Sequence, residues 1–292
     1  MDLTLDEFAA NVGVGDHVSI AGLGTRGGAT ATARVVAAPV GIDRIDAAEM
    51  VVECGAGTPV DELLDALRDH GQTVSLPSGG TVGGALAVGS SDITRLGHGA
   101  MRDVLLQTRY VSAAGKLTKA GGPTVKNVSG FDLCRLFVGA RGSLGFFGDV
   151  ILRTRPLART SRWFTSDRDP FELLGELHRP VALLWDGTTA WARLDGDADD
   201  VERSAQRFDL AGASGGPELP PHRWSLPPSG LPKLKSEAVG SFVAEIGVGV
   251  VHRHERAPSF AVDSATRQLH DRIKAQFDPT GRLNPGTDPA SP

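Results

Sequence analysis

Glycine constrains this chain more than any other residue type, because its glycines are clustered in the sequence. The chain holds 37 glycines in 292 residues, well above the average usage of ~7%. Seven lie between Gly79 and Gly99 and seven more between Gly121 and Gly148, with ordinary apolar segments between them. In a folded loop, glycine supplies a positive φ or lets a ligand approach the main chain closely. The clusters therefore predict a long ligand that lies along backbone amides.

The length, charge and cysteine content exclude several classes of protein. A chain of this length with 40% hydrophobic residues can bury one large core or two modest ones, which favours two domains. The net charge of -5, without any cluster of basic residues, argues against a nucleic-acid groove or a polybasic membrane patch. Cys54 and Cys134 lie in apolar runs without metal-ligand spacing, so we expect reduced, buried thiols. An acidic N-terminus and the lack of a long apolar stretch predict a cytoplasmic protein without a membrane span.

Hydrophobic alternation and turn signals predict a β-α-β arrangement near the N-terminus. Residues 16–22 and 49–57 each have the pattern of a strand that runs into a glycine-rich loop. Residues 58–71 follow as a helix with Thr58 as its N-cap. Farther along the chain, Thr81 is placed to cap a short helix of small residues.

The next elements complete the first half of the chain. Residues 103–122 predict two strands joined in a hairpin at Ala114–Gly115. Residues 131–139 predict a helix of about two turns that ends at a glycine. Residues 144–156 predict a strand that a proline terminates.

The composition changes after Pro156, which predicts a domain boundary. The glycine clusters end there, and three of the four tryptophans follow between Trp163 and Trp191. We expect a hairpin around Asp186–Gly187 and one long buried strand over 241–254. The predicted division places residues 1–157 in one domain, residues 158–258 in a second, and residues 259–292, with an amphipathic helix, back on the first.

A formal G-x-G-x-x-G pattern follows the first predicted strand, at residues 22–27. Glu53 ends a later strand, where a nicotinamide-binding fold has its ribose-binding acid. The segment after the third glycine is small and β-branched, which makes a poor helix. A nicotinamide site, a tight glycine turn and a different phosphate loop are therefore all open at this point.

A second glycine-rich stretch covers residues 77–91. No lysine follows at the spacing of a nucleotide triphosphatase, so that class of enzyme is excluded. The glycines can present main-chain N–H groups to a pyrophosphate, or they can allow close packing of a helix on a strand. The residues alone favour neither alternative.

Several ordered segments resemble one known family. The segments "VSIAGLGTRGG", "EMVVECGAGTPVDELLDALRDHGQ", "GGTVGGALAVGSS" and "VKNVSGFDLCRLFVGARGSLG" resemble the PCMH-type FAD-binding domain of the vanillyl-alcohol oxidase family. Within that family, "HRWSLPPSG", "EIGVGVVHRH" and "FDPTGRLNPG" are similar to the FAD-binding E subunits of bacterial glycolate oxidases. The resemblance implies an α+β fold, with an FAD-binding domain of two α/β subdomains and a small α+β cap domain that has an antiparallel sheet.

The resemblance also implies which residues contact FAD. Lys126 and Asn127 correspond to residues near the isoalloxazine, and Gly142, Ser143 and Gly145 to residues along the adenosine half. The family's first loop has glycine where Leu23 stands here, which places a side chain beside the phosphates. That loop contains no His or Cys for a covalent flavin bond, so we expect dissociable FAD. The implied contacts in the two upstream loops are Gly22, Gly24, Thr25, Arg26, Gly27, Pro77, Gly79, Gly80, Thr81, Gly83, Gly84, Gly89 and Ser90.

Oxidation of a 2-hydroxy acid by a flavin enzyme needs a base for the hydroxyl proton and a cation for the carboxylate. His252 is the candidate base, with a solvated strand end as the alternative interpretation. Lys126 is the candidate cation, while Arg135 is expected to pair with an acid at the helix surface and Lys235 is a third possibility. His252 and His254 share one face of a strand, but without a clear third ligand we expect no metal.

Together these features predict an FAD-dependent oxidoreductase subunit of a glycolate-oxidase-like complex. It would oxidise glycolate or D-lactate and pass electrons to an iron–sulfur subunit, beside a second flavin subunit. We expect it in the cytoplasm, or at the inner face of the membrane through its partners. The alternatives are a flavin-binding or degenerate subunit without turnover and a nicotinamide-dependent dehydrogenase built on residues 22–27.

Overall fold

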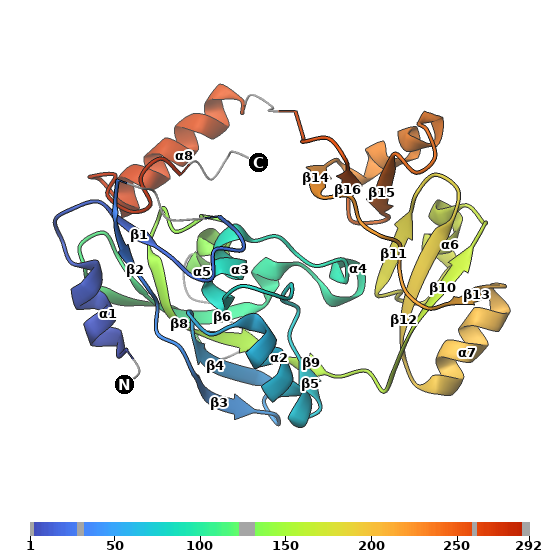
Figure 1. Ribbon diagram of the computed structural model, residues 1–292, viewed down its shortest axis with the longest axis horizontal. Coiled ribbons are helices and arrows are strands. Elements are labelled where there is room, and N and C mark those ends of the chain that lie inside the picture. The colour runs from blue at the N-terminus through green and yellow to red at the C-terminus, as the bar shows by residue number, and fades with distance from the viewer. Residues whose placement is uncertain (1–2, 28–31, 123–131, 259–261, 288–292) are drawn as a thin grey trace. The chain divides into compact units, whose positions relative to one another are not determined.

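The computed structural model describes residues 3–27, 32–122, 132–258 and 262–287. The chain forms two compact units (Figure 1). Unit 1 comprises Met1–Ser91, Ala100–Leu157 and Phe260–Pro292, and unit 2 comprises Asp92–Gly99 and Ala158–Ser259. None of the described helices is long and apolar enough to cross a membrane.

Unit 1 is built on a five-stranded antiparallel sheet with the order β3-β4-β8-β6-β7. Strand β8 lies in the middle, and all its residues except Arg153 are buried, as its apolar sequence dictates. The predicted hairpin at Ala114–Gly115 is confirmed, since β6 and β7 pair across it. The strands are β3 (Ile42–Asp46), β4 (Val51–Gly55), β6 (Leu105–Val111), β7 (Leu117–Gly121) and β8 (Phe146–Arg153).

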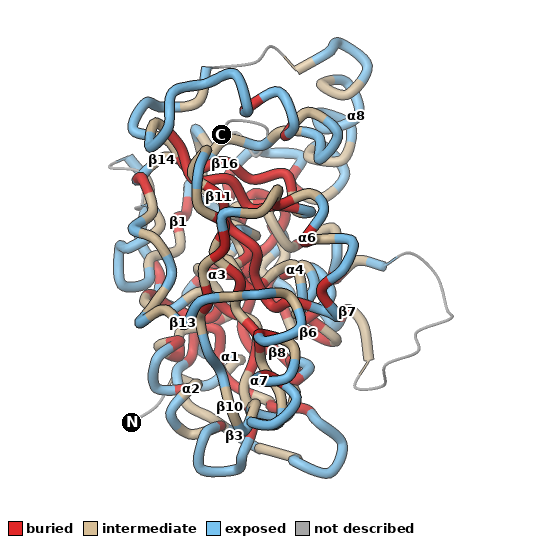
Figure 2. The backbone as a smooth tube through the Cα atoms, turned by 90° about the vertical axis from the view of Figure 1, so that its right-hand side faces the viewer, coloured by how far each residue is buried: buried red, intermediate tan, exposed pale blue. Residues whose placement is uncertain are grey.

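Two short strand pairs and several helices complete unit 1. A parallel pair, β1 (Val18–Ile20) and β2 (Arg34–Val36), carries the first glycine loop, and β5 (Gln72–Thr73) pairs with β9 (Arg155–Pro156). Helix α8 has no buried residue, and it appears in tan and pale blue in Figure 2. The helices of this unit are α1 (Leu5–Val12), α2 (Val60–Asp69), α3 (Val82–Val88), α5 (Leu133–Phe137), α8 (Ser264–Phe277) and the 3-10 turn η1 (Met101–Asp103).

The core of unit 1 joins helices α1, α2, α3 and α5 to the sheet. Phe8, Leu63, Leu86, Phe137 and Phe146 are almost wholly buried in one apolar cluster. Cys54 and Cys134 lie in the same cluster as free thiols, as expected. Burial raises the pKa of Cys54 to about 12 and that of Cys134 to about 11.

Unit 2 is built on a seven-stranded antiparallel sheet with the order β13-β10-β12-β11-β15-β16-β14. One face packs against α6 around Leu173, Trp185 and Phe242. The strands are β10 (Thr160–Ser166), β11 (Ala182–Trp185), β12 (Ala190–Gly196), β13 (Ala211–Ala213), β14 (His222–Ser225), β15 (Phe242–Glu245) and β16 (Val250–Arg253). The helices are α4 (Arg95–His98), α6 (Pro170–Glu176), α7 (Ala198–Arg207) and the 3-10 segment η2 (Pro228–Ser236).

The mixed α+β architecture with antiparallel sheets agrees with the predicted fold class, but three local predictions are wrong. Residues 241–254 form a hairpin of β15 and β16 instead of one strand, because Gly247 and Gly249 adopt φ of +81° and +88°. Pro59, and not Thr58, precedes α2 at the N-cap position, since the Thr58 hydroxyl bonds to the main chain of Gly41. The β-α-β start is also absent, because the strands before and after α2 lie in different sheets.

Candidate functional site

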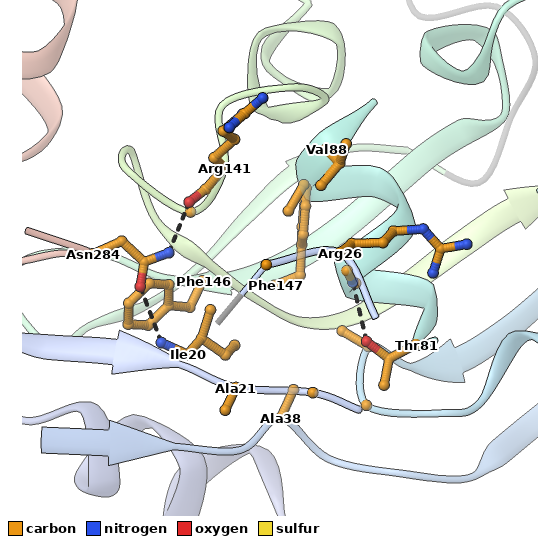
Figure 3. Close-up of a pocket in the computed structure, with 18 of the residues that line it drawn as sticks. Ile20, Ala21, Arg26, Ala38, Thr81, Val88, Arg141, Phe146, Phe147 and Asn284 are labelled. Carbon is orange, nitrogen blue, oxygen red and sulfur yellow. Dashed lines mark hydrogen bonds between the residues drawn. The ribbon is translucent and has the colours of Figure 1, made fainter. Parts of the chain in front are cut away.

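A pocket of about 240 Å³ in unit 1 brings together three chain segments that are far apart in sequence (Figure 3). The first is the loop over residues 22–27 that follows β1, and the second is the start of α3 with Thr81. The third is residues 141–147, which lead into β8. Clustered glycines in all three segments therefore face one cavity, as the sequence pattern predicts.

Backbone atoms of the first loop line the pocket, and few side chains of the loop cover them. Gly24 and Gly27 adopt φ of +71° and +108°, a region that glycine alone enters without strain. A Cβ on either residue would have no atom within 4 Å from the described residues beyond its own chain neighbours. The backbone conformation therefore requires these glycines, whereas packing does not. The side chain of Leu23 also lines the pocket but is mostly exposed.

Helix α3 begins at the second wall. The Thr81 hydroxyl caps the helix by accepting a hydrogen bond from the Gly84 N–H at 3.1 Å, as predicted. A Cβ on Gly83 would lie 2.9 Å from the Ala56 carbonyl oxygen, so this glycine allows the helix to pack closely on the end of β4. Close packing is the alternative that applies to Gly83, because its N–H donates to the Ala56 carbonyl oxygen at 2.7 Å, although the residue also lines the pocket.

Arg26 joins the first two walls. Its guanidinium donates hydrogen bonds to the carbonyl oxygens of Pro77, Ser78 and Gly79 at 2.5–2.9 Å. Burial lowers the pKa of Arg26, and the nearby carboxylate of Asp61 opposes that shift. The carbonyls of the second loop therefore hold Arg26.

The third wall is fixed by a residue that the sequence did not single out. Asn284 lines the pocket, and its side-chain oxygen accepts a hydrogen bond from the Ile20 N–H at 3.0 Å. Its side-chain nitrogen donates to the Arg141 carbonyl oxygen at 2.7 Å (Figure 3). The only signal in the sequence was its place in "FDPTGRLNPG", one of the segments that carry the family resemblance.

The structure brings part of the predicted cofactor set to the pocket. Lys126 and Asn127 lie outside the described residues. Gly89 ends α3 in the left-handed conformation, and the buried Ser143 hydroxyl donates to the Ala140 carbonyl oxygen. The predicted residues that line the pocket are Gly22, Gly24, Thr25, Arg26, Gly27, Thr81, Gly83, Gly84, Gly142 and Gly145. Those outside its lining are Pro77, Gly79, Gly80, Gly89, Ser90 and Ser143.

The candidate base His252 lies in unit 2, on β16. It is buried rather than a solvated strand end, and its Nε2 is 2.8 Å from Oε1 of the buried Glu245. Arg223, opposite His252 in the pairing of β14 with β16, places Nη2 3.4 Å from the same oxygen. Unit 2 thus holds an imidazole, a carboxylate and a guanidinium side by side.

The other predicted cations are paired. Arg135 contacts Asp103 at 2.7 Å and Asp132 at 3.1 Å, which confirms the expected surface pairing. Lys235 pairs with Asp169 in unit 2. Neither side chain is left as an unpaired cation.

Comparisons with known proteins agree with the pocket. Residues 12–121 match a family model described as "FAD binding domain". The chain is 28% identical over 299 residues to the glycolate oxidase subunit GlcE of Escherichia coli (strain K12), covering 84% of each protein. It is 36% identical over 118 residues to a D-lactate dehydrogenase of Archaeoglobus fulgidus, covering 39% of this chain and 27% of that protein. The solved structure of an alkyldihydroxyacetonephosphate synthase superposes with a TM-score of 0.71 at 13% identity, covering 97% of this chain and 74% of that one, which shows a shared fold.

The residues of the pocket fit FAD. The pyrophosphate of FAD carries two negative charges, which main-chain N–H groups of a glycine loop can bind. The open cradle at Gly24 and Gly27 is a place that a Cβ would fill, and the loop is next to the Arg26 guanidinium. The family match over residues 12–121 shows FAD as the cofactor, and the residues of this pocket fit it. The chain therefore carries an FAD binding domain over residues 12–121 and is similar to the glycolate oxidase subunit GlcE along most of its length.

Proposed function

We propose that the chain is the FAD-binding subunit of a complex that oxidises a small 2-hydroxy acid, glycolate or D-lactate, to the 2-oxo acid. The observation that carries the proposal is the pocket formed by three glycine-containing segments in a chain similar to GlcE along most of both lengths. The local similarity to a D-lactate dehydrogenase supports the same substrate class. Electrons would pass to an iron–sulfur subunit, and the similarity to subunits named GlcE and GlcD supports assembly with a second flavin subunit.

The FAD is proposed to bind without a covalent bond. The described residues that line the pocket include neither His nor Cys, the side chains that would form such a bond. Gly24, Thr25 and Gly27 would hold the pyrophosphate through their N–H groups. Lys126 and Asn127 remain proposed contacts of the flavin ring on the strength of the family resemblance alone.

His252 is the proposed base. When bound, FAD supplies the hydride acceptor. Because Glu245 holds Nε2 of His252, the hydroxyl proton of the substrate would move to Nδ1. The Glu245 carboxylate orients the ring and stabilises the imidazolium that results. Arg223, which lies beside this pair, is the proposed cation for the substrate carboxylate.

Anaerobic reduction of the FAD-loaded chain by glycolate or D-lactate tests the proposal. Loss of the flavin absorbance with the chain alone supports catalysis, while bound flavin that neither acid reduces supports the alternative of a flavin-binding subunit without turnover. His252→Gln should slow reduction about 100-fold or more and leave FAD bound, because glutamine keeps a polar partner for Glu245 but cannot act as a base. His254→Gln, an exposed neighbour on the same segment, is the matched control and should reduce at the rate of the original chain.

The sequence pattern no longer supports the alternative of a nicotinamide-dependent dehydrogenase. It rested on the pattern at residues 22–27, and that loop lies within the segment that matches an FAD binding domain. Reduction of the protein's flavin by NADH but by neither hydroxy acid would restore it.

A further inference from the structure

The C-terminal segment of unit 1 is built into the FAD pocket, although it lies far outside the family match over residues 12–121. Leu283 pairs in parallel with Val18 of β1. The Val18 N–H donates to the Arg282 carbonyl oxygen, and the Asn284 N–H donates to the Val18 carbonyl oxygen, both at 2.9 Å. Residues 282–284 thus pair alongside the short strand that leads into the first glycine loop.

Asn284 connects two walls of the pocket through one side chain. On one side it accepts from the N–H of Ile20, which ends β1, and on the other it donates to the carbonyl oxygen of Arg141. The side-chain amide matches both partners, because its oxygen accepts from the Ile20 N–H and its nitrogen donates to the Arg141 carbonyl oxygen. Asn284 also lies directly on Gly142, where an added Cβ would come within 2.5 Å of its side-chain nitrogen.

The backbone of Asn284 is unusual as well. Its φ is +44°, in the left-handed region that a non-glycine residue enters at a cost in free energy. Such a conformation persists only where the surrounding contacts fix it.

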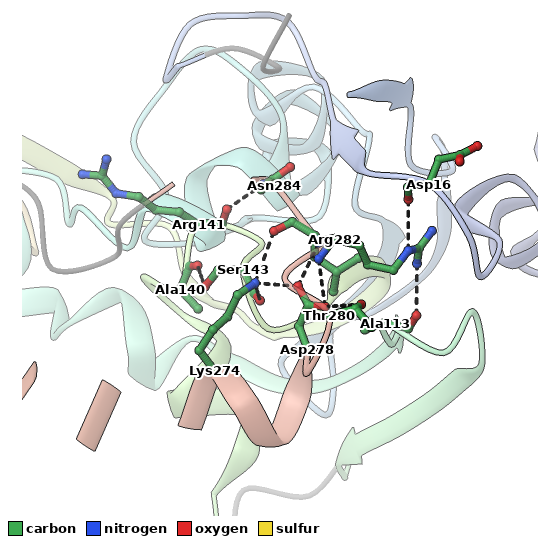
Figure 4. A network of polar contacts seen from close by, with 11 residues as sticks. Asp16, Ala113, Ala140, Arg141, Ser143, Lys274, Asp278, Thr280, Arg282 and Asn284 are labelled. Carbon is green, nitrogen blue, oxygen red and sulfur yellow. Dashed lines mark hydrogen bonds and ion pairs between the residues drawn. The ribbon is translucent and has the colours of Figure 1, made fainter. Parts of the chain in front are cut away.

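A buried polar network fixes the segment that carries Asn284 (Figure 4). The Asp278 carboxylate is buried and accepts from Lys274 Nζ at 2.6 Å, from the Leu283 N–H at 2.8 Å and from the Arg282 N–H at 3.1 Å. Lys274 Nζ also donates to the Ser143 carbonyl oxygen at 2.7 Å. The Arg282 guanidinium donates to three main-chain carbonyl oxygens, those of Val12, Asp16 and Ala113. The network therefore ties the segment to both the β1 side and the third wall.

We propose that Asn284 is a positioning residue of the FAD site, which sets the separation of the first glycine loop and the turn at Arg141–Gly142. Its two amide groups each hold main chain of one wall, so it acts on the cofactor through the loops. The proposal rests on the assignment of FAD to this pocket and on no assumption about the substrate.

Titration of the full-length, FAD-free protein with FAD tests the proposal, with flavin fluorescence giving the Kd and thermal unfolding giving the Tm of the FAD-free protein. Asn284→Gly removes both side-chain hydrogen bonds but allows the positive φ. We expect the Kd to rise about 10-fold or more, because the two walls lose the bonds that set their separation. The Tm should change little, because glycine also relieves the strain of the positive φ. Met50→Gly is the matched control, because Met50 also has a positive φ, lies in unit 1 and is not part of the pocket lining. It should keep the original Kd.

Asn284→Asp gives a second readout that a purely structural role would not produce. Its carboxylate keeps the acceptor for Ile20 but turns an oxygen toward the Arg141 carbonyl oxygen, so binding should be weak at neutral pH. The protonated acid can donate to that carbonyl, and the Kd relative to the original chain should fall as the pH is lowered.

The possible outcomes separate this proposal from the proposed function. Failure of the original chain to bind FAD would contradict both. FAD binding by the original chain together with an unchanged Kd for Asn284→Gly, or a fall in Tm large enough to account for the lost affinity, would overturn the role of Asn284 alone. If the Asn284→Gly protein does not fold, the Asn284→Asp variant decides. A relative Kd of that variant that does not change with pH would also overturn the role of Asn284.

Discussion

Among the single residues, different glycines of this chain are required for different physical reasons. Gly24 is needed because its φ is +71°, and the space beside it is open to the pocket. Gly83 is needed because a side chain would collide with Ala56. Gly80 leaves room for the side chains of Thr25 and Arg26. Gly24 and Gly83 line the pocket but Gly80 does not, so a glycine-rich pattern overstates the number of residues at the site.

Gly24→Ala should weaken FAD binding more than it destabilises the fold. The methyl group would enter the open cradle, and the positive φ adds a cost of about 1 kcal/mol for any non-glycine residue. Gly71→Ala is the matched control, since Gly71 has φ of +66°, an equally open Cβ position and no place in the pocket lining. Urea unfolding of the two FAD-free variants should give similar losses of stability, while FAD titration should weaken only for Gly24→Ala. Equal FAD affinity of the two variants would contradict a cofactor role for the first loop.

Asp278 makes the stability of unit 1 depend on pH. Burial raises its pKa, but hydrogen bonds from Lys274 and from the main chain of Leu283 and Arg282 outweigh that effect, so the pKa is lowered. A lowered pKa in the folded state gives stability that is present above the pKa of the unfolded state, about 4, and is lost as the pH falls through the folded value. Asp278→Asn should therefore reduce the free energy of unfolding by about 2 kcal/mol at pH 7.

The difference between the original chain and Asp278→Asn should shrink below pH 4 or so, because the aspartate is then neutral as well. Denaturant unfolding across this pH range measures it. Asp69→Asn, at the exposed end of α2, is the control and should change little at any pH. A difference that stays constant down to low pH would contradict the assignment of this charge to the stability of the unit.

Among the helices and strands, the sequence predicted the features that depend only on residues close together in the chain. The cap of α3 at Thr81 and the hairpin between β6 and β7 depend on neighbouring residues, and both are confirmed. The hairpin of β15 and β16 was missed because Val and Ile on both sides of Gly247 and Gly249 resemble one continuous strand. The role of Thr58 was missed because its hydroxyl bonds to Gly41, a partner outside its own helix.

The cap of α3 predicts a coupled effect on fold and cofactor. Thr81→Ala should cost about 1 kcal/mol of stability, because the Gly84 N–H loses its acceptor. FAD affinity should fall with it, since the start of α3 forms a wall of the pocket. Thr81→Ser keeps the hydroxyl and should restore most of both quantities, as measured by urea unfolding and FAD titration. Loss of affinity in Thr81→Ser equal to that in Thr81→Ala would argue against the capping bond as the cause.

At the scale of the whole molecule, the cofactor site depends on contacts that no local pattern encodes. Asn284 and Ile20 are separated by 264 positions, and a hydrogen bond across that distance has no signature in a single sequence. The side chains of His252 and Glu245 meet because a tight turn folds β16 back on β15, which the prediction of one long strand concealed. The glycine loops could be located from the sequence, whereas the residues that hold their walls together could not.

Binding of FAD in the pocket of unit 1 can be measured by a single titration. The full-length protein, freed of any bound cofactor, is titrated with FAD while the absorbance and fluorescence of the flavin are followed. We expect saturable binding of one FAD per chain and release of intact FAD on unfolding, because the FAD is not covalently bound. Affinity should be lost in Gly24→Ala but not in Gly71→Ala. A colourless protein whose flavin signals do not change on mixing with FAD would contradict it.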